Sequence, residues 1–402
     1  MARQLPRWSQ LRPLLRLNPW IWSPRGRRLA RAQTIADLRA AARRRVPRAV
    51  FDYTDGAADD EVTLTRARRV FGELEFHPRV LRDVGEVDPS TTILGARSAY
   101  PLVLAPTGFT RLMNHEGEAA VVRVAERYDV PYGLSTLGTT TIEQVAAVSP
   151  SARKWFQLYV SQDRAVSERL MARAQEAGYE ALVLTVDVPV SGRRVRDLRN
   201  GFSIPPNLNV RTLAGMARFP SWWANTLTTE PLSFATLSEW HGTVAELLDR
   251  TFDPRVTWDD LDWIRSWWNG PIVVKGVQTI DDVKRVAQAG AEAVVLSNHG
   301  GRQLDRAPVP LLLVPQAVAV AGGDCEVYVD TGVLSGQDII AAVALGARAV
   351  LVGRAYLYGL MAGGEPGVDR AMSILVDEMR RTMALLGAAD VSQLEPAHVS
   401  TP

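Results

Sequence analysis

Four apolar runs in the C-terminal half of the chain decide the fold: PIVVKG (271–276), EAVVLSNHGG (292–301), CEVYVDTG (325–332) and ARAVLVGR (347–354). Each run is rich in Val, Leu or Ile, lacks polar residues at alternate positions, and leads into polar or small residues. This pattern is typical of parallel β-strands that are buried on both faces. The same pattern occurs earlier in PLVLAPT (101–107), YGLST (132–136), KWFQLYV (154–160) and ALVLTVD (181–187).

Helical patterns lie between these runs, and most of them end in Gly or Ala-Gly, which is a common helix stop. Examples are Glu116–Tyr128, Ala165–Ala177, Ile280–Ala289 and Gly336–Leu345. Eight strand–helix repeats predict an α/β fold, a (β/α)8 TIM barrel. The alternative, a doubly wound open sheet, is disfavoured because the sequence has no G-x-G-x-x-G turn.

The spacing of the runs also predicts what is added to the barrel. The fourth and fifth runs start at residues 181 and 271, so a long insertion is expected between strands four and five, at about residues 190–270. The first 100 residues precede the barrel and predict an N-terminal helical extension. Residues 365–389 predict a closing amphipathic helix.

The composition is that of an ordinary globular protein: 402 residues, 47% hydrophobic and 22% charged, which excludes wholesale disorder and collagen. The single cysteine, Cys325, excludes an intrachain disulfide and fits a reducing compartment. The stretch Leu11–Trp22 is interrupted by arginines and prolines. We therefore expect neither an export signal nor a membrane-spanning helix.

Charge is distributed unevenly along the chain. Residues 1–50 contain thirteen arginines and one acid, Asp37, for a net charge of +12. The whole chain carries 46 − 44 = +2, so the remainder carries −10. We predict a basic N-terminal arm at residues 1–33 and a barrel domain at residues 34–395. The charge of this arm favours contact with an anionic partner, either a membrane or a polyanion. The alternative is that the arm is a solvated extension without a partner.

The candidate active-site residues are those at the ends of the apolar runs, because barrels of this type hold their active sites at the carboxyl ends of the strands. A histidine there, His299, can act as a general base with Asp187 as its partner. Arg302 suits bidentate capture of a carboxylate. Lys275 suits either a Schiff base or a positive charge beside an electron-accepting cofactor, and we favour the second.

Glycines after the seventh and eighth runs, Gly332 and Gly353, together with Arg354, indicate a phosphate site. Other chemistries lack support. The five histidines are scattered and no C-x-x-C or H-E-x-x-H occurs, so no metal is expected. A G-x-S-x-G elbow and a P-loop are also absent from the sequence.

The segment SNHGGRQLD (297–305) resembles the signature of the FMN-dependent family that oxidises α-hydroxy acids. Further segments fit that family in order: FDYTDGAADDE (51–61), LAPTGF (104–109), FQLYV (156–160), LTVDVP (184–189), VVKGV (273–277) and LVGRAYLYGL (351–360). The resemblance covers about residues 34–395. The insertion and the VDTG segment look most like the respiratory, quinone-dependent L-lactate dehydrogenase branch.

The resemblance implies FMN as cofactor and oxidation of an L-2-hydroxy acid, with L-lactate favoured, to the 2-keto acid. It implies His299 as base, Asp187 as its partner and Tyr159 as the group that orients the substrate oxygen. The substrate carboxylate would be held by Tyr53, Arg194 and Arg302. The flavin ring and ribityl chain would contact Pro106, Thr107, Gly108, Ser135, Gln157, Thr185, Lys275 and Ser297. The phosphate end would contact Asp330, Gly332, Gly353 and Arg354.

One position departs from the family pattern. Relatives often have an arginine in D-G-G-x-R-x-G after the seventh strand, whereas this chain has Leu334 there. Leucine cannot supply the charge, which leaves backbone N–H groups and Arg354 as the expected phosphate contacts.

The resemblance also implies partners: a quinone acceptor and peripheral contact with the cytoplasmic face of the inner membrane. We expect a homotetramer and no nucleic-acid partner. Eight of the aromatics in the insertion favour a membrane or protein interface, or a helix leading into strand five: Trp222, Trp223, Phe234, Trp240, Trp258, Trp263, Trp267 and Trp268. The alternatives are an O2-dependent oxidase, a mandelate dehydrogenase, an FMN-barrel isomerase and a non-catalytic scaffold.

Overall fold

A closed barrel of eight parallel strands forms the centre of the molecule, in the order β10-β11-β4-β5-β6-β7-β8-β9. The computed structural model describes residues 5–12, 21–201, 217–237 and 252–402. The strands are β4 (Leu102–Leu104), β5 (Tyr132–Ser135), β6 (Lys154–Leu158), β7 (Ala181–Thr185), β8 (Ile272–Val277), β9 (Ala293–Leu296), β10 (Glu326–Val329) and β11 (Ala349–Val352). Seven of them fall within an apolar run and β8 extends one residue beyond its run, so the predicted (β/α)8 barrel is confirmed.

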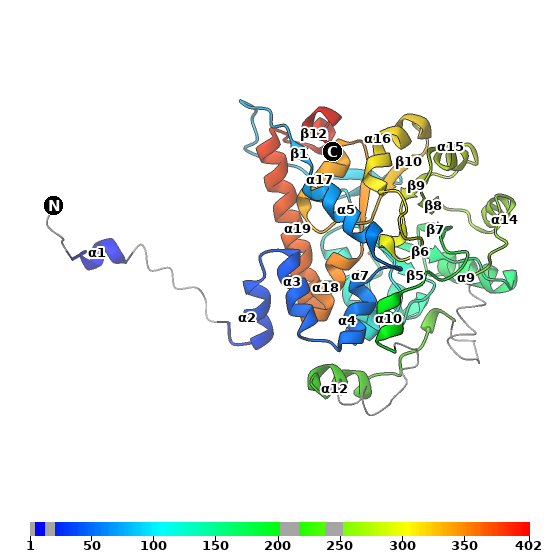
Figure 1. Ribbon diagram of the computed structural model, residues 1–402, viewed down its shortest axis with the longest axis horizontal. Coiled ribbons are helices and arrows are strands. Elements are labelled where there is room, and N and C mark those ends of the chain that lie inside the picture. The colour runs from blue at the N-terminus through cyan, green and yellow to red at the C-terminus, as the bar shows by residue number, and fades with distance from the viewer. Residues whose placement is uncertain (1–4, 13–20, 202–216, 238–251) are drawn as a thin grey trace.

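Helices surround the barrel, as Figure 1 shows. Those that follow the strands are α7 (Gly117–Arg127), α8 (Ile142–Val148), α9 (Arg164–Glu176), α14 (Asp259–Trp267), α15 (Ile280–Gln288), α16 (Pro310–Ala321), α17 (Gly336–Ala344) and α18 (Arg354–Gly363). The closing helix is α19 (Glu365–Leu386), as the sequence predicts. It packs against α7, α17 and α18.

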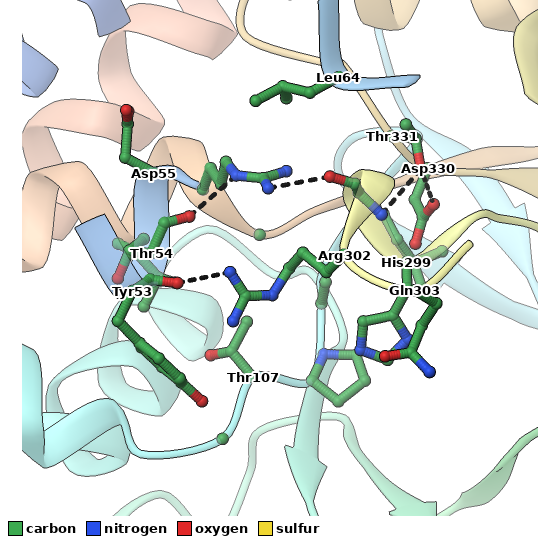
Figure 2. A pocket seen from close by; sticks show the side chains of 18 of the residues that line it. Tyr53, Thr54, Asp55, Leu64, Thr107, His299, Arg302, Gln303, Asp330 and Thr331 are labelled. Atoms are coloured by element: carbon green, nitrogen blue, oxygen red, sulfur yellow. Dashed lines mark hydrogen bonds between the residues drawn. The ribbon is translucent and has the colours of Figure 1, made fainter. Parts of the chain in front are cut away.

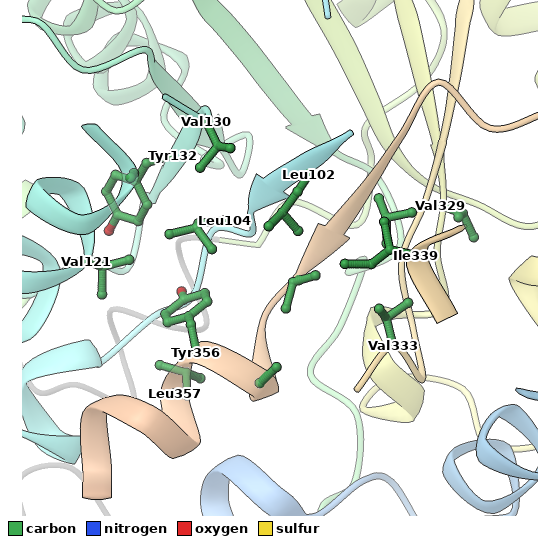
Figure 3. Close-up of a cluster of buried hydrophobic side chains, with 14 of the residues drawn as sticks. Leu102, Leu104, Val121, Val130, Tyr132, Val329, Val333, Ile339, Tyr356 and Leu357 are labelled. Atoms are coloured by element: carbon green, nitrogen blue, oxygen red, sulfur yellow. The ribbon is translucent and has the colours of Figure 1, made fainter. Parts of the chain in front are cut away.

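The strands are apolar throughout because both of their faces are buried. Alternate residues such as Val103, Val183 and Tyr328 point into the barrel, where they form a separate packed cluster. The intervening residues face the helices. Figure 3 shows Leu102 and Leu104 of β4 on this outer side, near Tyr356 of α18. Burial on two sides is the physical reason for the absence of polar alternation.

The N-terminal extension contributes α2 (Pro24–Arg31), α3 (Ile35–Arg43), α4 (Arg48–Asp55) and α5 (Val62–Gly72), preceded by the short α1 (Trp8–Leu11). Within the predicted arm, α2 packs against α18 and α19. Its Leu29 is buried, and Arg28 donates two hydrogen bonds to the carbonyl of Ala362. Three small elements complete this part: the hairpin β2 (Thr91–Ile93) and β3 (Ala96–Ser98), and β1 (Glu75–Phe76), which pairs with β12 (Val399–Ser400).

The insertion between β7 and β8 contains α10 (Val195–Arg199), α12 (Pro220–Thr228) and the 3-10 turn η1 (Ala235–Leu237). Trp222 of α12 is buried, and its indole N–H donates to the carbonyl of Leu112 at 2.9 Å. This ring therefore belongs to the core, and Leu227 is a large apolar residue of α12 that is exposed. The predicted helix that leads into β8 is α14, with Trp258 and Trp268 as its cap residues, whereas Trp240 lies outside the described residues.

No helix among the described residues is long and apolar enough to cross a membrane.

Candidate active site

His299 and Asp187 form a hydrogen-bonded pair at the carboxyl ends of two strands. His299 opens a 3-10 turn, η2 (His299–Gly301), after β9, and its Nδ1 lies 3.1 Å from Oδ1 of Asp187. Asp187 follows β7, and its side chain is almost fully buried. Gly276 makes this packing possible, since a Cβ there would come within 2.7 Å of the Asp187 side chain. The predicted pair is therefore present.

The environment of this pair favours the neutral form of His299 and the ionised form of Asp187. Burial lowers the pKa of His299 below its ordinary value, and the opposing charge of Asp187 does not fully compensate. Burial also acts to raise the pKa of Asp187, but the charge and hydrogen bond of His299, together with Lys275, keep that pKa low. Since Nδ1 faces Asp187, the Nε2 atom is the one available to a substrate.

Lys275 is a buried cation held by two neighbours. Its Nζ lies 3.0 Å from Oδ2 of Asp330 and donates to Oγ of Ser297 at 2.9 Å. Burial acts to lower the pKa of Lys275, but Asp330 and Asp187 outweigh it and the pKa is raised. The side chain is therefore a stable ammonium group. Ser297 also accepts the backbone N–H of His299 at 3.0 Å, which couples the lysine to the histidine loop.

An amide and a hydroxyl face the same cavity from neighbouring strands. Ser135 donates to Oε1 of Gln157 at 3.0 Å, which fixes the amide orientation. Gln157 Nε2 and Thr185 Oγ1 are buried, and neither has a hydrogen-bond partner among the described residues. Buried polar groups normally find partners. These two atoms therefore suit a ligand with hydrogen-bonding edges, such as a heterocycle.

Two arginines and a tyrosine form a cationic corner on the other side of the cavity. Arg302 donates to the backbone carbonyls of Tyr53 and Gly56, and its Cζ lies 4.9 Å from the Tyr53 ring centroid. The Cζ of Arg194 lies 5.9 Å from the same ring. Burial, together with the charge of Arg194, lowers the pKa of Arg302 to about 9. An anion placed here would relieve that unfavourable charge.

Tyr159 lies between the histidine pair and this corner. Burial, followed by the charge of Asp187, raises the pKa of its phenol. The hydroxyl is therefore protonated at neutral pH and can donate a hydrogen bond. The Tyr159 ring packs edge-on against Phe252, with 5.0 Å between centroids.

One cavity of about 1240 Å³ joins these groups. Its lining includes fifteen of the eighteen predicted site residues: Tyr53, Pro106, Thr107, Gly108, Gln157, Tyr159, Thr185, Arg194, Lys275, His299, Arg302, Asp330, Gly332, Gly353 and Arg354. Figure 2 shows Arg302 and Tyr53 facing each other, with His299 and Asp330 on the opposite side. The other three lie behind this lining and contact residues in it. Asp187 contacts His299, Ser135 donates to Gln157, and Ser297 accepts a hydrogen bond from Lys275.

Arg354 differs from its expected role in one respect. Its guanidinium donates to the carbonyls of Thr54, Gly56 and Gly300 at 2.8–2.9 Å. Gly300 has a φ of +66°, and a Cβ there would collide with the guanidinium. Arg354 therefore braces the histidine loop against the N-terminal extension, with its side chain largely committed to backbone oxygens.

Sequence reasoning missed three residues that join the site loops. Gln303 donates to the carbonyls of Asp187 and Val190 and accepts the N–H of Gly192, so it ties the loop after β7 to the loop after β9. Thr331, at a φ of +74°, accepts the N–H of Gly300.

The third missed residue is Arg196, which links α10 to Asp55 and Glu61. Gln303 and Thr331 lie inside segments quoted above, but neither was assigned a role, and Arg196 lies in none of those segments. The signal that could have found Gln303 is its place inside the SNHGGRQLD segment.

Comparison with known proteins agrees with this geometry. The family described as FMN-dependent dehydrogenase matches residues 42–401. The chain belongs to this family. FMN is its cofactor, as the sequence predicts, and the unpartnered amide and hydroxyl, the buried lysine and the size of the cavity suit a flavin nucleotide. Among the described residues, no group of three or more His, Cys, Asp or Glu side chains could hold a metal ion.

Relatives of this FMN-dependent dehydrogenase match along nearly their whole length. A Mycobacterium tuberculosis protein, provisionally named L-lactate dehydrogenase, is 53% identical over 398 residues, covering 99% of this chain and 96% of the relative. The L-lactate dehydrogenase of Caulobacter vibrioides is 43% identical over 365 residues, covering 89% and 95%.

Solved structures of mandelate dehydrogenases are also similar. The monotopic membrane protein (S)-mandelate dehydrogenase has a TM-score of 0.88 and 36% identity, covering 92% of this chain and 100% of its own. A soluble mutant of the membrane-associated enzyme from Pseudomonas putida has a TM-score of 0.80 and 37% identity, covering 92% and 99%.

Proposed function

We propose that the protein oxidises L-lactate to pyruvate with FMN and passes the electrons to a membrane quinone. The observation that carries this proposal is one cavity in which the His299–Asp187 pair faces two arginines, beside the buried Lys275–Asp330 pair. A base, an anion-binding corner and a buried cation are the parts that oxidation of a 2-hydroxy acid requires.

The substrate carboxylate binds at the cationic corner. Arg302 and Arg194 supply charge and forked donors, and the Tyr53 ring lies against both guanidinium groups. This contact fixes one end of the substrate, so that its hydroxyl lies toward His299 and Tyr159. Tyr159, which stays protonated, donates to the substrate oxygen.

His299 removes the hydroxyl proton at Nε2. The neutral ring is the form that accepts a proton, and Asp187 stabilises the imidazolium that results. When bound, FMN supplies the acceptor for the carbon-bound hydrogen of the substrate together with the electron pair of the C–H bond, which completes the two-electron oxidation. The ammonium group of Lys275 stabilises negative charge on the cofactor side of the cavity.

L-lactate is favoured over L-mandelate because the two relatives with the highest identity above carry the lactate name. Mandelate is the second candidate, since the structures compared above are mandelate dehydrogenases. Anaerobic stopped-flow bleaching of the flavin by L-lactate, glycolate and L-mandelate separates the two. We expect fastest bleaching by L-lactate, and faster bleaching by mandelate would reverse the assignment.

The same experiment tests the remaining alternatives. Absence of bleaching by any 2-hydroxy acid would contradict the proposed oxidation and would favour an isomerase or a scaffold. Stoichiometric peroxide in air, with no reduction of a quinone analogue, would identify an oxidase.

A quinone acceptor places the working enzyme at a membrane. The monotopic mandelate dehydrogenase supports peripheral contact, as does the arginine-rich arm. We propose the cytoplasmic face of the inner membrane as the location and a homotetramer as the assembly. Light scattering of the purified protein tests the assembly, and a mass below that of four chains would contradict it.

A further inference from the structure

The loop between β10 and α17 provides few free groups for a phosphate. Leu334 has no charge, and its backbone N–H donates to Oδ2 of Asp338 at 2.8 Å. The N–H of Gly336 donates to Oε2 of Glu378 at 2.7 Å. The Arg354 guanidinium is bonded to three carbonyls of other segments. The groups that the sequence suggested for phosphate binding are thus largely committed elsewhere.

A cation from a distant part of the chain lies at this loop. Arg68, on α5, lines the same cavity as Gly332, Leu334 and Ser335. Its Nη1 donates to the carbonyl of Gly332 and to Oδ2 of Asp338, the latter at 2.7 Å. Figure 1 draws α5 beside α17, as this ion pair requires.

The rest of the Arg68 guanidinium remains available. In the described part of the chain, both of its hydrogen bonds use Nη1, which leaves the Nε and Nη2 donors for a ligand. The side chain is half-buried and rests on the Phe71 ring, with 5.5 Å from Cζ to the centroid. It is therefore positioned in advance, and a preorganised guanidinium suits the oxygens of a phosphate monoester.

The other charged residues around this loop are less suited than Arg68 to bind a phosphate. Arg39 also lines the cavity, but it forms a bidentate pair with Asp55. Glu378 accepts the backbone N–H of Gly336, and burial raises the pKa of its carboxyl. Asp338 forms an ion pair with Arg68 and fixes the guanidinium at the loop.

We propose that Arg68 supplies the positive charge that binds the phosphate of FMN, in place of the arginine that relatives carry at the position of Leu334. The inference rests on FMN being the cofactor of this site. It assigns the phosphate contact to a residue of the N-terminal extension. Loss of that contact should therefore weaken binding of a flavin that carries a phosphate and spare one that does not.

The test compares FMN with riboflavin, which lacks the phosphate, on full-length protein stripped of flavin. Quenching of flavin fluorescence gives both dissociation constants. We expect Arg68→Leu to weaken FMN binding by roughly 10- to 100-fold, as for loss of a charged hydrogen bond, and to leave riboflavin binding within about twofold. The matched control is Arg69→Leu on the same helix, where Arg69 is exposed and pairs with Glu73. It should change neither constant.

Two further variants separate phosphate binding from a purely structural ion pair. Asp338→Asn removes the ion pair but keeps Arg68, so it should retain the preference for FMN over riboflavin. Arg68→Leu combined with Leu334→Arg should recover FMN affinity, because it returns a guanidinium to the loop.

Equal weakening of FMN and riboflavin by Arg68→Leu, or failure of Leu334→Arg to restore FMN binding, would overturn the assignment. A wild-type protein that binds neither flavin would instead overturn the proposed function.

Discussion

His299 has one ring nitrogen left for chemistry, and this makes its role directly testable. Nδ1 is held by Asp187, so replacement of the imidazole by an amide side chain removes the proton acceptor. We expect His299→Gln to retain FMN and to lower kcat for L-lactate by roughly 10²- to 10⁴-fold, the usual effect of a missing general base. Steady-state assays with a soluble dye acceptor measure the loss.

The matched control is His77→Gln, because His77 is not among the residues that line the cavity and contacts Oγ of Ser400 at 3.1 Å. This variant should behave as wild type. A His299→Gln enzyme with more than a tenth of wild-type kcat would remove the residue from the mechanism.

The pKa of His299 sets the pH dependence of the reaction. Burial lowers this pKa, so the neutral, proton-accepting ring persists to lower pH than for a free histidine. We expect kcat/KM to fall only below about pH 6.5, the ordinary value for histidine. A profile of kcat/KM from pH 4.5 to 8 checks the position of this acidic limb, and a limb centred above pH 6.5 would contradict the lowered pKa.

Asp187→Asn tests the partner of the same ring. The carboxylate favours the charged imidazolium, so its removal should lower the pKa of His299 further and shift the acidic limb to lower pH. The maximal rate should fall by at least about 100-fold, because the imidazolium loses its counter-charge. An unchanged pH profile with a reduced rate would show that Asp187 only positions the ring.

Residues at strand ends could be predicted from the sequence, whereas residues that act across the fold could not. His299 and Asp330 follow recognisable buried strands and Lys275 lies near the end of another, and the geometry of a parallel barrel brings such ends together. Arg68 lies 264 residues before its partner Gly332, in an arginine-rich helix where one more arginine carries no signal. Only the packing of α5 on the barrel reveals it.

At the scale of elements, an ion-pair cluster fastens the start of the insertion to the N-terminal extension. Arg196 of α10 donates to Asp55 at 3.0 Å and to Glu61, and Arg39 also holds Asp55. These contacts join α10 to α4. Arg194 lies two residues before Arg196, and Tyr53 lies two residues before Asp55, so the cluster positions both predicted carboxylate ligands.

Arg196→Gln should therefore raise KM for L-lactate by about three- to thirtyfold, through loss of charged hydrogen bonds that hold the loop, and should leave FMN content unchanged. The matched control is Arg199→Gln on the same helix, since Arg199 is exposed. Steady-state kinetics and the flavin absorbance ratio report the two effects separately. A fall in FMN content without a change in KM would place the cluster in cofactor binding instead.

Elements whose sequence pattern is set by burial were predictable, and helices of four or five residues were not. The eight strands and the helix α19 have patterns set by burial, which the sequence displays. By contrast, α6 (Thr110–Met113) and α10 span four and five residues. Helices of that length are marginal in isolation, so tertiary contacts such as the ion pairs of Arg196 determine them.

At the scale of the whole molecule, basic and aromatic residues gather in the N-terminal arm. Trp8 and Trp22 are 67% and 83% exposed, and the first 20 residues include four arginines. Trp222 of the insertion is buried, so it contributes no exposed ring. The arm is therefore the better candidate for contact with an anionic membrane, since each arginine near the surface contributes about 1 kcal/mol.

A protein lacking residues 1–20 should therefore sediment less with anionic vesicles than the full chain, most clearly at low salt, where charge attraction is least screened. It retains α2, whose Leu29 is packed on the barrel, so the fold should persist. Reduction of a membrane quinone should fall with binding, while activity toward a soluble dye should remain. Leu227→Ser in the full chain is the control for the insertion. If that variant loses vesicle binding and the truncated protein keeps it, the contact lies at α12 rather than at the arm.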